Sequence, residues 1–164
     1  MKKHSIFFVF ILFSISVYAQ DIVDNEITLE YINRCYNYLN KPVPVNFVNV
    51  GSSDGPIRRG ERFVNQLGDI FLHAHNNNVF FSSFGLLFEL TSAANRFHTM
   101  IIDTLETTGW RYYGKTPFNN MDIYIKNNVG ALVGPVRRRS SDNLLIVSVD
   151  FLTEEDFPDM FEYP

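Results

Sequence analysis

The chain has 164 residues, 46% of them hydrophobic, and its 14 basic and 18 acidic side chains give a net charge of −4. An acidic balance argues against a general nucleic-acid binder, because nucleic-acid phosphates attract basic surfaces. The single cysteine, Cys35, excludes a disulfide within the chain, so the fold has to be stabilised by apolar burial.

The N-terminal segment predicts export. Lys2 and Lys3 precede an apolar run over 6–17, and a small residue follows at Ala19. This order is typical of a secretory signal peptide, so we expect residues 1–19 to be removed. The apolar run has about 12 residues where a spanning helix needs about 20, so we expect no membrane span.

The processed chain would be more acidic than the precursor. Loss of Lys2 and Lys3 leaves 12 basic residues against the same 18 acidic ones, which is a net charge of −6. About 145 residues then remain, enough for one domain, which we place at residues 20–152. Residues 153–164 form an acidic tail that contains aromatic side chains. We expect a periplasmic or extracellular protein.

The first predicted element is a helix over residues 24–40, where apolar side chains recur at helical spacing. Cys35 lies on this apolar stripe and near the C-terminal end, where the helix dipole disfavours a thiolate. We therefore expect a buried thiol rather than a nucleophile or an intermolecular bridge. A strand follows over 43–50 and a loop over 51–56, and residues 57–68 show only a weak helical pattern.

The middle of the chain predicts a hairpin. Two apolar runs, 70–75 and 79–89, are separated by the asparagines of 76–78, which tolerate a positive φ angle. The clearest helix spans 91–108, and Gly109 directly after it is a residue that commonly terminates helices. Four further strands are predicted at 110–114, 121–126, 131–137 and 144–152. The order predicts an α+β fold, an antiparallel sheet of about six to seven strands with two main helices on one face.

Two histidines in the hairpin raise the question of a metal site. On a strand, His73 and His75 share one face and are able to bind one zinc ion, but a third ligand is required. No nearby carboxylate supplies it clearly, so we favour a hairpin pair without metal. A metal-dependent hydrolase through His73 and His75 remains the alternative.

A second candidate for chemistry is the loop pentapeptide over 51–55, which fits G-x-S-x-G with Ser53 in the centre. In serine hydrolases this pattern forms a sharp strand-to-helix turn. The chain does not show the alternating strands and helices of that fold, so a serine hydrolase is kept only as an alternative. No phosphate loop, paired-cysteine motif, dinucleotide fingerprint or calcium loop occurs, and we expect no cofactor.

Two arginine clusters and one sheet face are the candidate binding features. The clusters hold half of the basic residues of the processed chain and suit a carboxylate-rich or phosphate-bearing partner. If Met121, Ile123 and Ile125 point to the core, polar and aromatic side chains line the other face of the C-terminal strands, with Ser148 and Asp150 among them. The candidate binding residues are Arg58, Arg59, Arg62, Arg111, Tyr113, Asp122, Tyr124, Arg137, Arg138 and Arg139.

These features favour an exported, non-enzymatic binding protein over a hydrolase. We expect a protein or a small anionic ligand as partner, recognised by the sheet face and the arginine loops. A structural subunit that docks through its acidic, aromatic tail is a third hypothesis. Oligomeric state and ligand identity do not follow from the sequence.

Overall fold

The computed structural model describes residues 24–53, 60–116 and 119–155. The predicted signal peptide, Arg58, Arg59 and tail residues 156–164 lie outside this part of the chain. Two helices are described, and none is long and apolar enough to cross a membrane. The elements in chain order are α2 (Asn25–Tyr38), β1 (Phe47–Ser53), β2 (Gly60–Asn65), β3 (Ile70–His75), β4 (Asn78–Phe88), α3 (Thr91–Thr107), β5 (Arg111–Lys115), β6 (Asp122–Lys126), β7 (Val129–Val133), β8 (Arg137–Arg138) and β9 (Leu145–Thr153).

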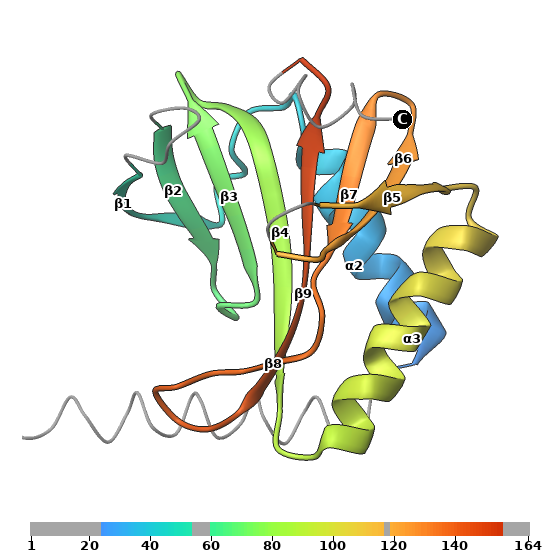
Figure 1. The fold of residues 1–164 in the computed structure, drawn as a ribbon. Helices are drawn as coiled ribbons and strands as arrows, with labels where there is room; N and C mark the ends of the chain where they lie inside the picture. Colours follow the sequence, from blue (N-terminus) through green and yellow to red (C-terminus); the bar gives the residue numbers. More distant parts are fainter. Residues whose placement is uncertain (1–23, 54–59, 117–118, 156–164) are drawn as a thin grey trace, which may run out of the picture.

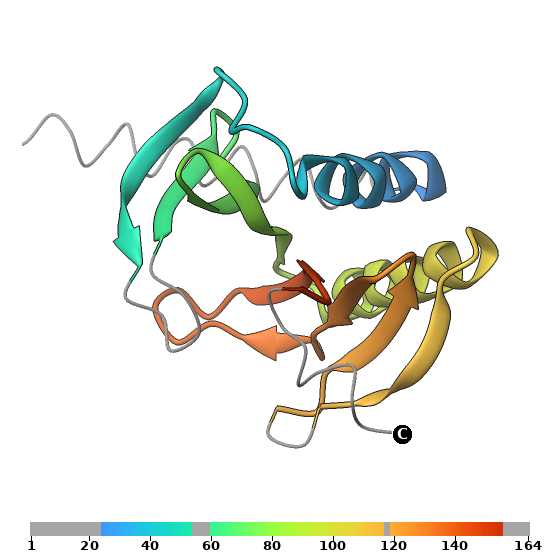
Figure 2. The same ribbon diagram turned by 90° about the horizontal axis from the view of Figure 1, so that it is seen from above.

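All paired strands run antiparallel, and the described strands form one nine-stranded sheet. Its order is β1-β2-β3-β4-β9-β7-β6-β5, with β8 paired to β9. The long strands β4 and β9 lie in the middle, and both helices pack on the same side of the sheet (Figures 1 and 2). The predicted α+β class, with its antiparallel sheet and its helices on one face, is confirmed.

Local sequence explains where the helices begin and end. The Asp24 carboxylate accepts a hydrogen bond from the Ile27 backbone N–H at 2.9 Å, which caps α2. α3 follows Leu90, and no side chain caps its first turn. It ends before Gly109, whose φ of 86° is a conformation that glycine adopts without strain.

The main hydrophobic core lies between the helices and the sheet. It contains the stripes of α2 and α3 and the strand residues that face them, including Phe84, Phe88 and Phe151. Cys35 is fully buried in this core, as its helical position predicts. A second, smaller cluster of Met121, Ile123, Leu132 and Leu152 lies apart from it.

Two strands were not expected. Residues 57–68 showed a weak helical pattern, but Gly60–Asn65 form β2, which pairs with both β1 and β3. Pairing on two sides satisfies more backbone groups than a short helix would, and this outweighs a weak local pattern. The short strand β8 begins at Arg137, the last residue of the single strand that was predicted over 131–137.

Asparagine pairs make two of the hairpin turns. Asn76 and Asn77 have φ of 49° and 63°, and Asn127 and Asn128 have φ of 49° and 62°. Two consecutive positive φ angles are those of a type I′ turn, whose twist matches the flanking strands. The expected three-residue loop is therefore a two-residue turn, because Asn78 already pairs with His75.

Candidate functional site

We call the side of the sheet that faces away from α2 and α3 the outer face. Strand register places one continuous row of side chains across it, from the edge strand β1 to β6. In order along the row, these residues are Val48, Val64, Phe71, Ser83, Asp150, Leu132 and Ile123. The row is apolar at both ends and polar at its centre.

The β1–β3 end of the row is exposed. Val48 is 58% exposed and Phe71 is 42% exposed, although both are large apolar side chains. Val64 lies directly between them in the strand register and is half-buried. Exposed apolar side chains that adjoin one another, rather than occurring singly, are typical of an interaction surface.

The centre of the row is acidic. Asp150 lies on β9 between Ser83 of β4 and Leu132 of β7. Solvent reaches part of its side chain, but burial raises the pKa of the carboxyl to about 6. No described residue forms a salt bridge or a hydrogen bond with this carboxylate in the contacts we observe. Within residues 24–53, 60–116 and 119–155, no basic group places a counter-charge beside Asp150.

Sequence reasoning placed Asp150 on the outer face but did not select it as a site residue. The sequence feature that could have selected it is that Asp150 is the one charged residue in the apolar stretch from Leu144 to Leu152. A carboxylate at the centre of a sheet costs free energy unless it is paired, so its presence calls for an explanation.

The predicted orientation of β6 is wrong. Tyr124 is 3% exposed and belongs to the main core, and its hydroxyl donates to Glu106 of α3 at 3.3 Å. Burial, followed by the nearby Glu106 charge, raises the pKa of Tyr124 to about 12. Ile123 instead lies on the outer face, in the second cluster. Alternation separates Ile123 and Ile125 from Asp122, Tyr124 and Lys126, but it does not show which of these two faces the helices cover.

Asp122 and β5 also depart in part from the expected face. Asp122 shares the helix side with Tyr124 and forms an ion pair of 2.6 Å with Lys115. Tyr112 is 48% exposed and packs against Tyr124. Arg111 is exposed in the same row as Ile125, and Tyr113 packs against the second cluster, so both lie on the outer face as predicted.

The arginines do not form one cluster. Arg62 is exposed on β2 opposite His73, and Arg137 lies opposite Ile146, so both are on the outer face. Arg137 donates to the Asn119 carbonyl at 2.9 Å. Arg138 pairs with Leu145 on the other side, and Arg139 forms an ion pair with Asp142. Of the described arginines in the predicted clusters, Arg62 and Arg137 are brought to the candidate site.

The two histidines lie on one strand face without further ligands. His73 pairs with Phe81, and their rings are 5.0 Å apart, while His75 pairs with Asn78. Burial and then the charge of Arg62 lower the pKa of His73. Within the described ranges, no group of three metal-ligating side chains exists. The geometry gives the metal-dependent alternative no support.

In the part of the chain that the structure describes, the element after Ser53 is a strand and not a helix. Ser53 is the last residue of β1 and pairs with Gly60 at the start of the antiparallel strand β2. A nucleophile elbow requires a helix directly after the strand. The serine-hydrolase alternative therefore lacks the structural context that its motif needs.

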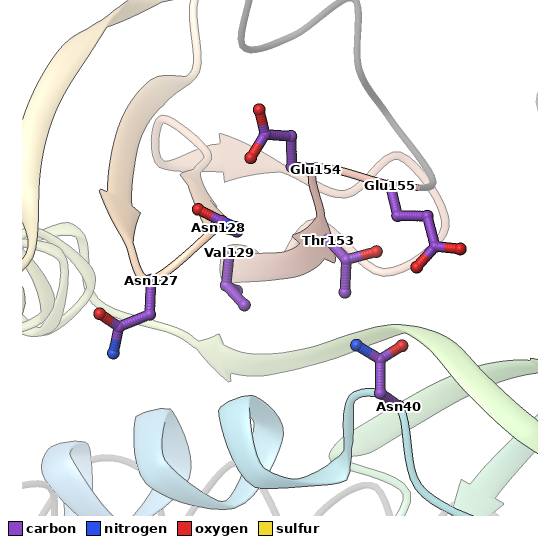
Figure 3. Close-up of a pocket in the computed structure, with 7 residues that line it drawn as sticks. All are labelled: Asn40, Asn127, Asn128, Val129, Thr153, Glu154 and Glu155. Atoms are coloured by element: carbon purple, nitrogen blue, oxygen red, sulfur yellow. The ribbon is translucent and has the colours of Figure 1, made fainter.

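A separate hollow of about 490 Å³ lies at one end of the sheet. In Figure 3, Asn40 reaches toward Thr153 from the segment after α2, and the β6–β7 turn closes another side. Carboxamide and carboxylate groups predominate, so the hollow suits hydrogen-bond donors. Its lining residues are Asn40, Asn127, Asn128, Val129, Thr153, Glu154 and Glu155.

Comparison with known proteins gives no relative: no protein-family model, no curated protein and no solved structure matches the chain.

Proposed function

We propose that this chain is an exported, non-enzymatic binding protein that docks a protein partner on the outer face of its sheet. The main observation in support of this proposal is the exposed apolar pair Val48 and Phe71, which Val64 joins in one cross-strand row. A broad sheet face suits a protein partner better than a small ligand, which needs a concave site.

The charges on the same face indicate what the partner carries. Arg62, Arg111 and Arg137 are exposed around the apolar row. Arginine pairs with carboxylates in a bidentate geometry, and exposed arginines at the edge of an interface favour acidic groups on the partner. The partner is therefore expected to present an apolar strip with acidic residues at its borders. Export of the chain is supported by the basic lead and apolar run at its N-terminus.

Site-specific photo-crosslinking tests this proposal with a matched control. A benzophenone amino acid is introduced at Phe71, on the outer face, or at Tyr112, an exposed aromatic residue on the helix side. In cells that express the exported chain, the Phe71 position should give an adduct of defined mass and the Tyr112 position should not. Introducing Val48→Lys should abolish the Phe71 adduct, because the charge interrupts the apolar row.

Two results would contradict the proposal. One is equal adducts from both positions, and the other is a Phe71 adduct that persists unchanged with Val48→Lys. Intact-mass measurement of the recovered chain tests export in the same preparation, with a start at Gln20 expected.

A further inference from the structure

The residues around Asp150 on the outer face are small. Small residues lie next to it on the outer face, namely Ser83, Gly85, Ser148 and Gly134. A Cβ atom built on Gly85 would meet the Ser148 Cβ at 3.6 Å, and one built on Gly134 would meet the Ser148 Oγ at 3.5 Å. These are ordinary van der Waals distances, so the surface around the carboxylate is closely packed and formed by small side chains.

The other neighbours are apolar. Leu132 and Leu152 are buried beside Asp150 on the same face, and together with Met121 and Ile123 they make the second cluster. A ligand group that contacts this surface meets one carboxylate, two serine hydroxyls and aliphatic side chains. A charged group on a hydrocarbon stem matches this combination.

The basic groups of the outer face are too distant to supply the counter-charge. His73 lies two strands from Asp150 in the register, and Arg62 lies three strands away, which is about 10 and 14 Å between backbones. Arg137 is opposite Ile146, four residues along β9, or roughly 13 Å. Burial is the cause of the raised carboxyl pKa, with no charged neighbour opposing it.

We propose that Asp150 is a recognition point for a basic side chain, an ammonium or guanidinium group of the docked partner. This inference rests on the proposed docking face and names the chemistry at its centre. A cation placed between Ser83 and Leu132 supplies the missing counter-charge, and its hydrocarbon stem lies against the second cluster. The exposed arginines around the face then meet acidic residues of the same partner, so that the charges of the two surfaces are complementary.

Small cations provide a test that does not need the partner. The ¹⁵N-labelled chain is titrated with n-butylammonium and n-butylguanidinium, and backbone amide shifts are followed by NMR. Both cations should give saturable shifts at Ser83, Gly85 and Ser148, whereas n-butanol and butyrate should not. Asp150→Asn should weaken cation binding at least about tenfold, because a charge-assisted contact is lost. Asp122→Asn removes an acid of the helix side and should leave cation binding unchanged.

A second measurement uses pH on the unmodified chain. Cation affinity should fall as the pH is lowered from 7.5 to 5, since protonation removes the Asp150 charge. The other described charged or titratable groups of this face are the arginines, which stay charged over this range, Tyr113 on β5, and His73 and His75 on β3, two strands away. Retention of full affinity at pH 5, or saturable shifts that persist in Asp150→Asn, would overturn the proposal.

The outcome separates this inference from the proposed function. If the Phe71 crosslink forms but Asp150→Asn leaves both it and the cation shifts unchanged, the docking face stands and the basic-group assignment fails. If no Phe71 adduct forms, the docking function fails, and the cation titration decides the chemistry at Asp150 independently.

Discussion

The Tyr31 hydroxyl donates a hydrogen bond to the Asp69 carboxylate, which joins α2 to the turn between β2 and β3. Asp69 is only 6% exposed, and its other oxygen accepts from the Asn65 side-chain amide at 2.6 Å. The Asn65 side-chain oxygen Oδ1 in turn accepts from the backbone N–H groups of Asp69 and Ile70. Burial, followed by the hydrogen bond to Asp69, raises the pKa of Tyr31. A buried carboxylate is thus satisfied by donors from two elements.

Removing the Tyr31 hydroxyl should destabilise the fold. Tyr31→Phe leaves the Asp69 carboxylate with one donor fewer, and we expect the free energy of unfolding to fall by about 1–3 kcal/mol. Urea denaturation followed by circular dichroism measures this loss. Tyr36→Phe is the control, because its hydroxyl accepts only an exposed hydrogen bond of 3.4 Å from Asn127. Equal losses in the two variants would show that the network contributes nothing specific.

Asp150 should make the free energy of unfolding fall as the pH rises from 4 to 7. Its folded pKa of about 6 lies above the ordinary value of 3.8, so the folded state holds the proton over the range where the unfolded state has lost it. The stabilisation of the folded state that results is complete below about pH 4 and is lost as the pH rises through 6. It amounts to roughly 3 kcal/mol at most. Asp150→Asn should remove this slope and raise the thermal midpoint at pH 7. If the variant and the parent chain have parallel pH profiles from 4 to 7, the carboxyl is not the cause.

The thiol of Cys35 should be almost unreactive in the folded protein. Its side chain is fully buried, and burial raises the pKa of the thiol, so the thiolate that reacts is scarce. Labelling with a thiol reagent should be slow under native conditions and fast in denaturant. Similar rates in both states would mean that the α2 face is not packed as described. The unreactive outcome would also exclude an intermolecular disulfide through this residue.

The two hairpin histidines should be dispensable for the fold and for zinc. Replacing both His73 and His75 with Gln is expected to change stability by no more than about 0.5–1 kcal/mol, since neither side chain is fully buried. Thermal melts with zinc and with a chelator should superimpose, because a metal that binds only the folded state would raise the midpoint. A zinc-dependent rise that the double variant abolishes would restore the metal-site hypothesis.

Gly60 should not tolerate a side chain. A Cβ atom there would lie 2.7 Å from the Ala74 carbonyl oxygen and 2.9 Å from the Phe80 ring. We expect Gly60→Ala to cost about 1–3 kcal/mol through overpacking. Gly85→Ala is the matched comparison, because its nearest contact would be an ordinary 3.6 Å. A stability loss in Gly85→Ala as large as that in Gly60→Ala would contradict the close packing of β2 on β3 and β4.

The local sequence determined those elements whose formation depends on residues close to one another along the chain. Asp24 with the apolar stripe fixed α2, and Gly109 marked the end of α3. The paired asparagines at 76–77 marked a hairpin turn because this residue tolerates the left-handed region. Burial of Cys35 also followed from helical periodicity alone. Each of these depends on chemistry within a few residues along the chain.

The tertiary structure decided which face of each strand meets the helices. β6 alternates isoleucines with Asp122, Tyr124 and Lys126. Only its register with β7 and β9 shows that Tyr124 faces the core and Ile123 the outer face. The same long-range pairing turned 60–65 into a strand and aligned Val48, Phe71 and Asp150 in one row. Cross-strand neighbours are far apart in sequence, and hydrogen bonding between strands, rather than local periodicity, selects their register.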